Sequence, residues 1–216
     1  MKKLLGILLL SFSAALAFTQ TACAAPNKGY TVLAAPQPVN VPHGKVEVIE
    51  FFWYGCPHCN AFDPYLEAWV KKQGANVVFR RVPMAFSDAL VPHSKLYHAL
   101  RELGVEQRLT PVVFREVHQR EIQAQREDVM VTPDEQAAFL AKNGVDPKKF
   151  LAAYNSFATQ SAVQRDNQLI SNYRINGVPT LIVQGKYETG PSIADSLPDV
   201  TKVLDFLVSQ IRAGRM

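Results

Sequence analysis

The sequence contains little cysteine: its 216 residues include three, at positions 23, 56 and 59. It also has no strong excess of either charge, because 23 Lys and Arg residues stand against 19 Asp and Glu residues. So few cysteines exclude a small scaffold held together by several disulfides. A formal net charge of +4, with the basic residues dispersed along the chain, argues against nucleic acid as a partner.

Long hydrophobic runs are also scarce, and the clear one lies at the N-terminus. Two lysines precede an apolar run from Leu4 to Phe18, and Ala22-Cys23-Ala24 supplies the small residues that a signal peptidase reads. These features predict a secretory signal peptide over residues 1–24, cleaved after Ala24. The run is short for a membrane span, and no later stretch approaches the required length. Export would place the protein in an oxidising compartment, where a disulfide persists.

Cys23 lies near the end of this signal, so it is either removed with it or lipidated. Gln20 is a poor match to the apolar residue that a lipidation site usually has three positions before its cysteine. We therefore expect cleavage without lipidation. Cys56 and Cys59 are then the only cysteines of the mature chain, and the loss of two lysines lowers the formal net charge from +4 to +2.

These two cysteines form the sequence Cys56-Pro57-His58-Cys59, directly after an apolar stretch at residues 46–53. Two thiols three residues apart at a strand-to-helix junction are typical of a redox pair that exchanges disulfides with other proteins. A purely structural disulfide would close so short a loop that it would add little stability. A zinc site needs about four ligands, which the dispersed histidines do not supply, and haem attachment needs histidine where Asn60 stands. We expect neither a metal nor a cofactor.

The position of this pair predicts the direction of exchange. Cys56 would sit at the start of a helix, where unpaired backbone N–H groups and aligned peptide dipoles stabilise an anion. His58 would stabilise the same thiolate by its charge or by a hydrogen bond. Since only the reduced form carries this charge, both effects make the disulfide a strong oxidant. The dipeptide Pro57-His58 therefore favours donating disulfides, with Cys59, one turn into the helix, as the more buried resolving thiol.

A second signal is Gly177-Val178-Pro179-Thr180, directly before a predicted strand. An X-Pro bond at such a point is either cis, a rare and purposeful geometry, or part of a simple loop that ends the preceding helix. Beside a Cys-x-x-Cys in this topology we favour the first interpretation. The loop would then lie against the thiols, and the Val178 backbone could pair with an extended substrate segment.

Glu50 is the third candidate, because it interrupts the otherwise apolar stretch at residues 46–53. The alternation pattern fits a buried carboxylate and an edge or surface carboxylate about equally. If it is buried near the thiols, a raised pKa would suit proton transfer to or from Cys59. Arg80 or Arg81 on the next strand could be its partner, and the sequence does not choose between them.

The order of the elements predicts the fold. Strands are expected at residues 30–33, 46–53, 76–82, 180–184 and from 187, and helices at residues 56–73, 90–103, 111–123, 133–143, 147–154, 161–175 and 200–212. Pro64 predicts a kink or a restart in the first helix. A β-α-β half and a β-β-α half around a block of helices indicate an α/β protein, a thioredoxin fold with an inserted helical domain. We assign residues 25–86 and 174–216 to the thioredoxin-like domain and residues 87–173 to the insertion.

Together these residues resemble the DsbA family of bacterial periplasmic thiol:disulfide oxidases, over most of the mature chain. The resemblance rests on Glu50-Phe-Phe with the Cys-Pro-His-Cys sequence, and on Gly177-Val178-Pro179 with the following Val183-Gln-Gly-Lys-Tyr187. It implies periplasmic localisation, substrates that are unfolded exported proteins with free cysteines, and a membrane reoxidase of the DsbB type. We expect a monomer.

The resemblance also implies a role for each site residue. Cys56 would be the exposed attacking thiol and Cys59 the buried one. A cis Val178–Pro179 bond would face both sulfurs, and Glu50 would be a buried acid. The buried lysine that usually partners this acid in the family has no match here, since Arg80-Arg81 occupies its neighbourhood.

Two alternatives stay open. An isomerase or reductase of the same fold would use the same cysteines, but isomerases of this kind usually carry a dimerisation domain. About twenty residues of the mature chain precede residue 46, which leaves no room for one. A binding module or chaperone with a helical groove and an incidental disulfide is the alternative from a different class.

Overall fold

The computed structural model describes residues 29–85, 87–126 and 128–216. The predicted signal peptide and Cys23 lie outside these ranges, so their processing stays a prediction. In chain order the elements are β1 (Thr31–Val32), β2 (Val46–Phe52), α1 (Pro57–Gln73), a 3-10 helix (Gly74–Asn76), β3 (Val77–Pro83), α2 (Val91–Glu102), α3 (Glu106–Ala124), α4 (Pro133–Lys142), α5 (Pro147–Tyr154), α6 (Phe157–Tyr173), β4 (Thr180–Val183), β5 (Tyr187–Thr189) and α7 (Leu197–Arg212).

The strands form one sheet in the order β1-β5-β4-β2-β3. β2 runs parallel to β3 and antiparallel to β4, so α1 makes the crossover that a parallel pair requires. All seven residues of β2 are buried, as its apolar sequence predicts for an interior strand. This arrangement confirms the predicted β-α-β and β-β-α halves.

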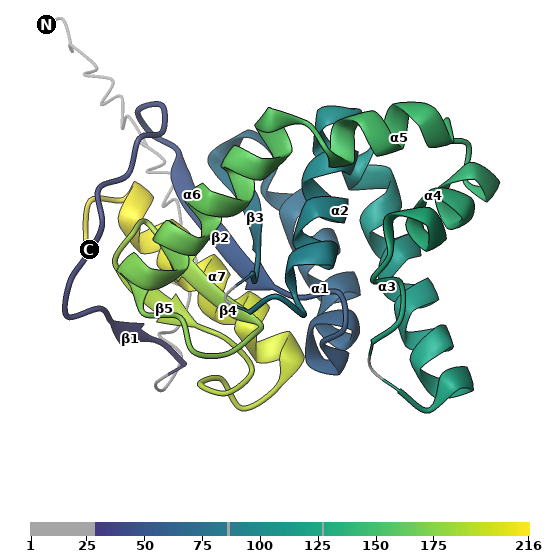
Figure 1. Cartoon of the computed structure of the whole chain (residues 1–216). Coiled ribbons are helices and arrows are strands. Elements are labelled where there is room, and N and C mark those ends of the chain that lie inside the picture. Colours follow the sequence, from purple (N-terminus) through teal and green to yellow (C-terminus); the bar gives the residue numbers. More distant parts are fainter. Residues whose placement is uncertain (1–28, 86, 127) are drawn as a thin grey trace, which may run out of the picture.

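The two faces of the sheet are covered by different helices (Figure 1). Val46 and Val48 point to α1 and α7, where they pack with Leu66 and Leu204. Alternate residues of the same strand point to the other face, where Ile49 packs against α6. The sheet is therefore a central layer, which suits a strand with apolar residues on both sides.

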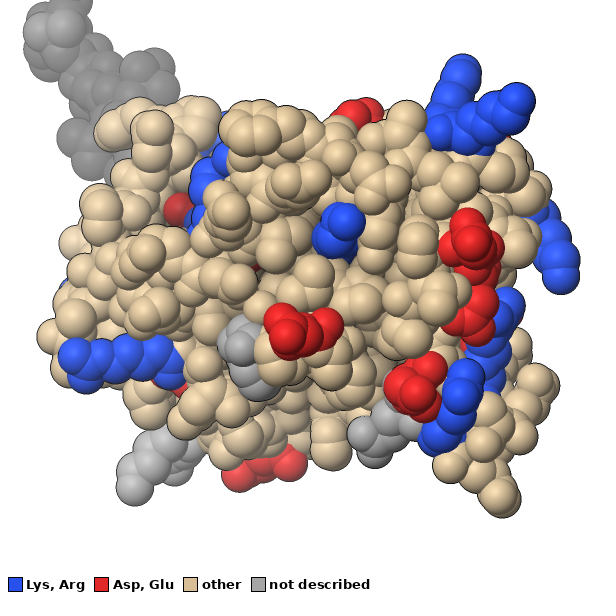
Figure 2. Space-filling model, viewed as in Figure 1, with Lys and Arg blue, Asp and Glu red and all other residues tan. Residues whose placement is uncertain are grey.

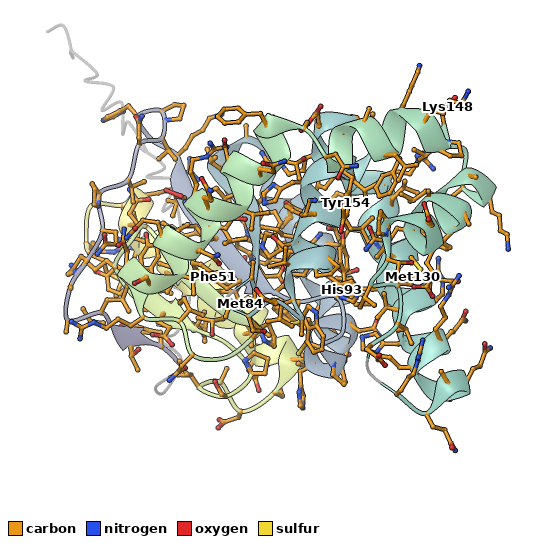
Figure 3. The ribbon with its side chains drawn as sticks, viewed as in Figure 1. Phe51, Met84, His93, Met130, Lys148 and Tyr154 are labelled. Atoms are coloured by element: carbon orange, nitrogen blue, oxygen red, sulfur yellow. The ribbon has the colours of Figure 1, made fainter. Side chains whose placement is uncertain are left out.

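Helices α2 to α5 form a separate block beside the sheet, on the right in Figure 1. In Figure 3, Phe51 and Met84 lie by the sheet, whereas Met130 and Tyr154 lie among these helices. The core of this block also includes Phe52, Tyr54, Cys56 and Cys59. The inserted helices thus pack directly on the segment that carries the two thiols.

Three helices begin earlier than the sequence predicts. α3 starts at Glu106 and contains Pro111, which we expected at its start; Pro64 likewise lies inside a continuous α1. α6 starts at Phe157 because the Ser156 side chain accepts a hydrogen bond from the Thr159 backbone N–H. α7 starts at Leu197 in the same way, with Ser196 as its N-cap. At α6 and α7, side-chain caps therefore set starts that apolar periodicity alone placed too late, whereas α3 begins without a capping side chain.

Neither a membrane-spanning helix in the described residues nor a basic patch on the face drawn in Figure 2 is found. Within residues 29–85, 87–126 and 128–216, no helix combines the length and the apolar character that crossing a bilayer requires. On the face shown in Figure 2, Lys and Arg are interspersed with Asp and Glu, and neither sign forms a continuous patch. This face matches the dispersed charge of the sequence.

Replacement of Phe52 by alanine should lower the free energy of unfolding by about 3–5 kcal/mol. The Phe52 ring is fully buried, with ring centroids 5.1 Å from Tyr54, 5.3 Å from Tyr97 and 5.7 Å from Phe114. The matched control is Phe157→Ala, because the Phe157 side chain is 84% exposed. Urea unfolding of both variants measures the difference, and equal losses would contradict this account of the core.

Candidate redox site

The two cysteines lie at the junction between the end of β2 and the start of α1. Cys56 is the N-cap of α1, with φ −85° and ψ 114°, and Pro57 occupies the first helical position, where its missing N–H costs nothing. No side chain caps this helix end. The Cys56 sulfur nevertheless lies near the backbone N–H groups of His58 and Cys59, which favour its thiolate.

The two sulfurs have different environments, and both cysteines are free thiols in the structure. Cys56 is buried, with 7% of it exposed, so the expectation of an exposed attacking thiol is wrong for this structure, in which the helical insertion and the loop at Val178 cover it. Cys59 is fully buried. A hydrogen bond from the Cys59 thiol, helped by backbone N–H groups and the charge of His58, lowers the pKa of Cys56 to about 6 against the opposing effect of burial. Burial, together with its bond to Cys56 and the negative charge of Glu50, raises the pKa of Cys59 far above its ordinary value. Near neutral pH, Cys56 is therefore mostly a thiolate, whereas Cys59 stays a protonated thiol.

The loop before β4 faces Cys56. The Val178–Pro179 peptide bond is cis, as the family resemblance implies. The Cys56 thiol donates a hydrogen bond to the Val178 carbonyl oxygen, with the sulfur and the oxygen 3.5 Å apart. Gly190 allows the chain after β5 to lie against this loop, since a Cβ there would approach the Pro179 carbonyl oxygen to 2.8 Å. Cys56 and Val178 are far apart in sequence, and the fold brings them together.

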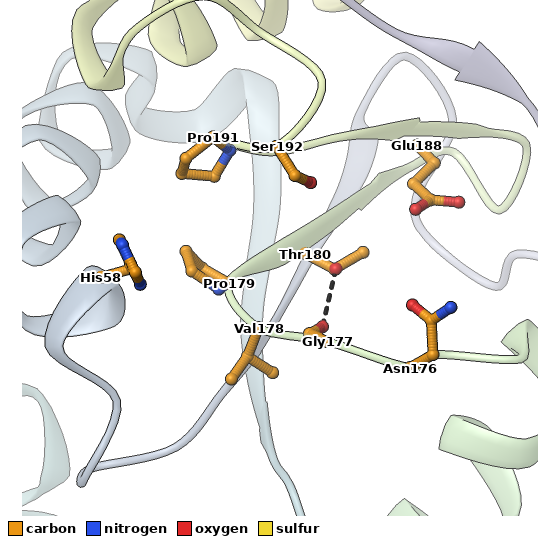
Figure 4. A pocket seen from close by; sticks show the side chains of 9 residues that line it. All are labelled: His58, Asn176, Gly177, Val178, Pro179, Thr180, Glu188, Pro191 and Ser192. Atoms are coloured by element: carbon orange, nitrogen blue, oxygen red, sulfur yellow. Dashed lines mark hydrogen bonds between the residues drawn. The ribbon is translucent and has the colours of Figure 1, made fainter.

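A groove of about 290 Å³ runs along this loop (Figure 4). His58 lies at one end of it, on the first turn of α1. The remaining lining comes from the loop around Pro179 and from the segment that follows β4: Asn176, Gly177, Val178, Thr180, Glu188, Pro191 and Ser192. The groove therefore begins beside the redox pair and continues over the end of the sheet.

Glu50 is fully buried, which settles the choice between a core and a surface carboxylate. Its Oε2 accepts a hydrogen bond of 2.6 Å from Arg81, which also donates to Asp63 over 2.7 Å and to Glu67 over 2.8 Å. Burial raises the pKa of Glu50 to about 7 and that of Asp63 to about 6, although Arg81 opposes both shifts. One guanidinium thus binds three carboxyl groups. Because the pKa values of Glu50 and Asp63 are raised, one of these carboxyl groups can stay protonated near neutral pH.

The register of the sheet selects Arg81 rather than Arg80 as the partner of Glu50. In the parallel pair, Glu50 lies opposite Arg81 and both side chains point to the α1 face. Arg80 points to the opposite face and pairs with Glu47 over 2.8 Å. The second oxygen of Glu50, Oε1, is buried without a hydrogen-bond partner among the described residues. This oxygen is available to carry a proton.

Comparison with known proteins gives the family. Residues 47–205 match the model of the DSBA-like thioredoxin domain. The chain belongs to this family. It is 52% identical over the full length of both chains to the thiol:disulfide interchange protein DsbA of Burkholderia cepacia. It is 39% identical to the protein of the same name from Pseudomonas aeruginosa, over 87% of this chain and 85% of the relative.

Solved structures of the family support the same assignment. The crystal structure of Pseudomonas aeruginosa DsbA has a TM-score of 0.78 and 39% identity, and the match covers 87% of this chain and 94% of that one. The DsbA structure from Xylella fastidiosa has a TM-score of 0.76 and 33% identity, with coverage of 86% and 96%. The chain is thus a thiol:disulfide oxidoreductase with a thioredoxin fold and an inserted helical block.

Sequence reasoning missed several residues of the site. Asp63 and Glu67 follow Cys59 at intervals of four, a spacing that places all three on one helix face and could have revealed the cluster. Tyr54 lies 3.2 Å from the Thr110 hydroxyl, which joins the redox turn to α3. His118 of α3 lies beside the backbone carbonyls of Tyr54 and Cys56, and burial lowers its pKa. No sequence pattern pointed to the contacts made by α3.

Replacement of Arg81 by methionine should lower the free energy of unfolding at pH 8 by about 3–5 kcal/mol, because buried carboxylates lose their cation. The control is Arg80→Met, whose 39% exposed side chain pairs with Glu47 and should cost about 1 kcal/mol or less. The loss for Arg81→Met should shrink at pH 5, where Glu50 and Asp63 are neutral. Urea unfolding at both pH values tests this, and an equal loss at both would contradict the assignment.

The reduced protein should lose stability relative to the oxidised protein as the pH falls. The pKa of the Cys56 thiol is lowered to about 6 in the folded protein. Its thiolate therefore stabilises the reduced fold fully at pH values above the ordinary thiol pKa, and this stabilisation is lost as the pH falls through about 6. Between pH 8 and 5.5 the difference should change by about 2 kcal/mol, at roughly 1.4 kcal/mol per pH unit. Reduced Cys56→Ala should follow the oxidised protein. Parallel pH profiles for the reduced and oxidised wild type would contradict the stabilised thiolate.

Proposed function

We propose that this protein oxidises pairs of thiols in newly exported proteins by donating its Cys56–Cys59 disulfide. The observation that carries the proposal is the unequal pair: Cys56 has a pKa lowered to about 6, and Cys59 has a raised pKa and no exposure. Stabilisation of the Cys56 thiolate favours the reduced form, so the disulfide is a strong oxidant. This agrees with the thiol:disulfide interchange named for the relatives.

The exchange takes place in two displacements. A substrate thiolate attacks the Cys56 sulfur, the bond between Cys56 and Cys59 breaks, and its electron pair leaves on the Cys59 sulfur. A second substrate thiolate then attacks the substrate sulfur of the mixed disulfide and releases Cys56 as a thiolate. The substrate gains one disulfide and the protein gains two electrons.

The surrounding residues support these steps. The Cys59 thiolate formed in the first step is buried and needs a proton, and Glu50, with a pKa raised to about 7, is suited to supply it. Pro57 occupies the first position of α1, and the charge of His58 favours the Cys56 thiolate. Pro179 and the backbone of Val178 line the groove beside Cys56 and would hold an extended substrate segment.

The biological setting belongs to the same proposal. The signal peptide predicted for residues 1–24 directs the chain to the periplasm, and a membrane protein of the DsbB type restores the disulfide. The substrates are unfolded exported proteins with free cysteines, and the protein acts as a monomer without metal or cofactor. Residues 25–86 and 174–216 form the catalytic domain, and residues 87–173 form the insertion that shields Cys59.

The reduction potential of the Cys56–Cys59 pair tests the direction of exchange. Equilibration of the mature protein with glutathione buffers should give a reduction potential of about −120 mV, the value of a strongly oxidising member of this family. Thioredoxin, a reductant, has a reduction potential of about −270 mV. A value near the lower figure would overturn the donor assignment and favour a reductase.

A trapping experiment separates the enzyme from a binding module. Cys59→Ala lacks the resolving thiol, so Cys56 should accumulate mixed disulfides with cysteine-containing exported proteins, detected by non-reducing electrophoresis after alkylation. Cys56→Ala is the matched control and should trap none. Absence of Cys56-dependent adducts would indicate a binding protein with an incidental disulfide.

A further inference from the structure

The far end of the groove holds a carboxylate without a partner. Glu188 lines the groove, and its side chain makes no hydrogen bond or ion pair within the described parts of the chain. In Figure 4 the Glu188 carboxylate and the Asn176 amide point toward one another, and no hydrogen bond joins them. His58, at the other end, is the one residue among the described lining residues that can carry a positive charge.

The position of Glu188 in the sheet makes this carboxylate unusual. It lies in β5, which is paired on both sides, with Thr31 of β1 opposite it on one side and Ile182 of β4 on the other. Glu188 is partly buried there. Glutamate is disfavoured in strands, and a partly desolvated charge without a partner costs free energy. Such an arrangement is typical of a functional site, where a ligand supplies the missing charge.

The distance from the redox pair suits a substrate contact. Ile182, opposite Glu188, is three residues along β4 from Pro179, which corresponds to about 10 Å of extended chain. A substrate segment whose cysteine has reacted with Cys56 would therefore reach Glu188 with a side chain about three residues away. A lysine or arginine there would pair with the carboxylate, while the Asn176 amide and Ser192 hydroxyl offer further hydrogen bonds.

We propose that Glu188 is a specificity-determining residue that favours substrate segments with a basic residue about three positions from the reacting cysteine. This inference rests on the proposed function, since it requires Cys56 to form a mixed disulfide with an extended segment in the groove. Glu188 takes no part in the exchange of sulfurs, so its effect lies in which segments react fastest.

The test uses peptides whose single cysteine is activated as a mixed disulfide with thionitrobenzoate. The Cys56 thiolate of reduced Cys59→Ala attacks the peptide sulfur, the peptide disulfide breaks, and thionitrobenzoate leaves with the electron pair and is measured by its absorbance. Otherwise identical peptides carry Lys, Ala or Glu three residues before or after the cysteine. The Lys peptide of at least one series should react about two- to fivefold faster than its Ala counterpart, and the Glu peptide slower.

Two further variants assign the preference to this carboxylate. Adding Glu188→Gln should abolish the difference between the Lys and Ala peptides, measured as the ratio of their two rates in the same variant. The matched control is Asp195→Asn, which removes the charge of an exposed residue outside the groove and should keep the preference. Added salt at 0.5 M should reduce the preference in the parent protein.

The outcomes distinguish this inference from the function on which it rests. Equal rates for the Lys and Ala peptides in both series, or a preference that survives Glu188→Gln, would overturn the role of Glu188 and leave the exchange activity standing. No reaction with any peptide, including the Ala peptide, would overturn the proposed function itself.

Discussion

The packing of the inserted helices on the turn between β2 and α1 is the interaction on which the site depends. Phe52 and Tyr54 enter the core of the insertion together with Phe114, and the Tyr54 hydroxyl lies within hydrogen-bond distance of Thr110. This packing removes water from Cys59 but leaves Cys56 slightly exposed. Burial raises the pKa of Cys59, whereas at Cys56 the hydrogen bond from the Cys59 thiol outweighs burial and lowers the pKa. The same four-residue sequence therefore contains one acidic thiol and one thiol that resists ionisation.

The buried charges follow from the same constraint. A strand that is covered on both faces is normally apolar throughout, yet β2 has the buried carboxyl group of Glu50 near its middle. Arg81 makes this possible by binding Glu50, Asp63 and Glu67 at once, so it links β3, β2 and α1. A guanidinium suits this position because it presents several donors in fixed directions, which a lysine ammonium in the same place would not.

The sequence predicted those parts of the site that local patterns encode. Spacing placed Cys56 and Cys59 at a helix start, and the loop at Pro179 was expected beside them. The choice between Arg80 and Arg81 depended on strand register, which alternation alone does not determine. Asp63 was missed because an acid on an amphipathic helix usually faces solvent, and the start of α3 was misplaced because Pro111 was taken for a first-turn residue. Contacts between distant segments, such as α3 with the redox turn, need the folded chain.

The groove is built from segments that lie far apart in sequence, since 122 positions separate Cys56 from Val178. The N-terminal part of the chain, which contains both cysteines, is synthesised before the segment that contains Val178, Glu188 and Ser192. A chain that has been synthesised only as far as α6 thus contains both sulfurs but lacks most of the residues that line the groove. The two thiols therefore exist before the groove beside them, which is completed only when β4, β5 and the segment after them have been synthesised.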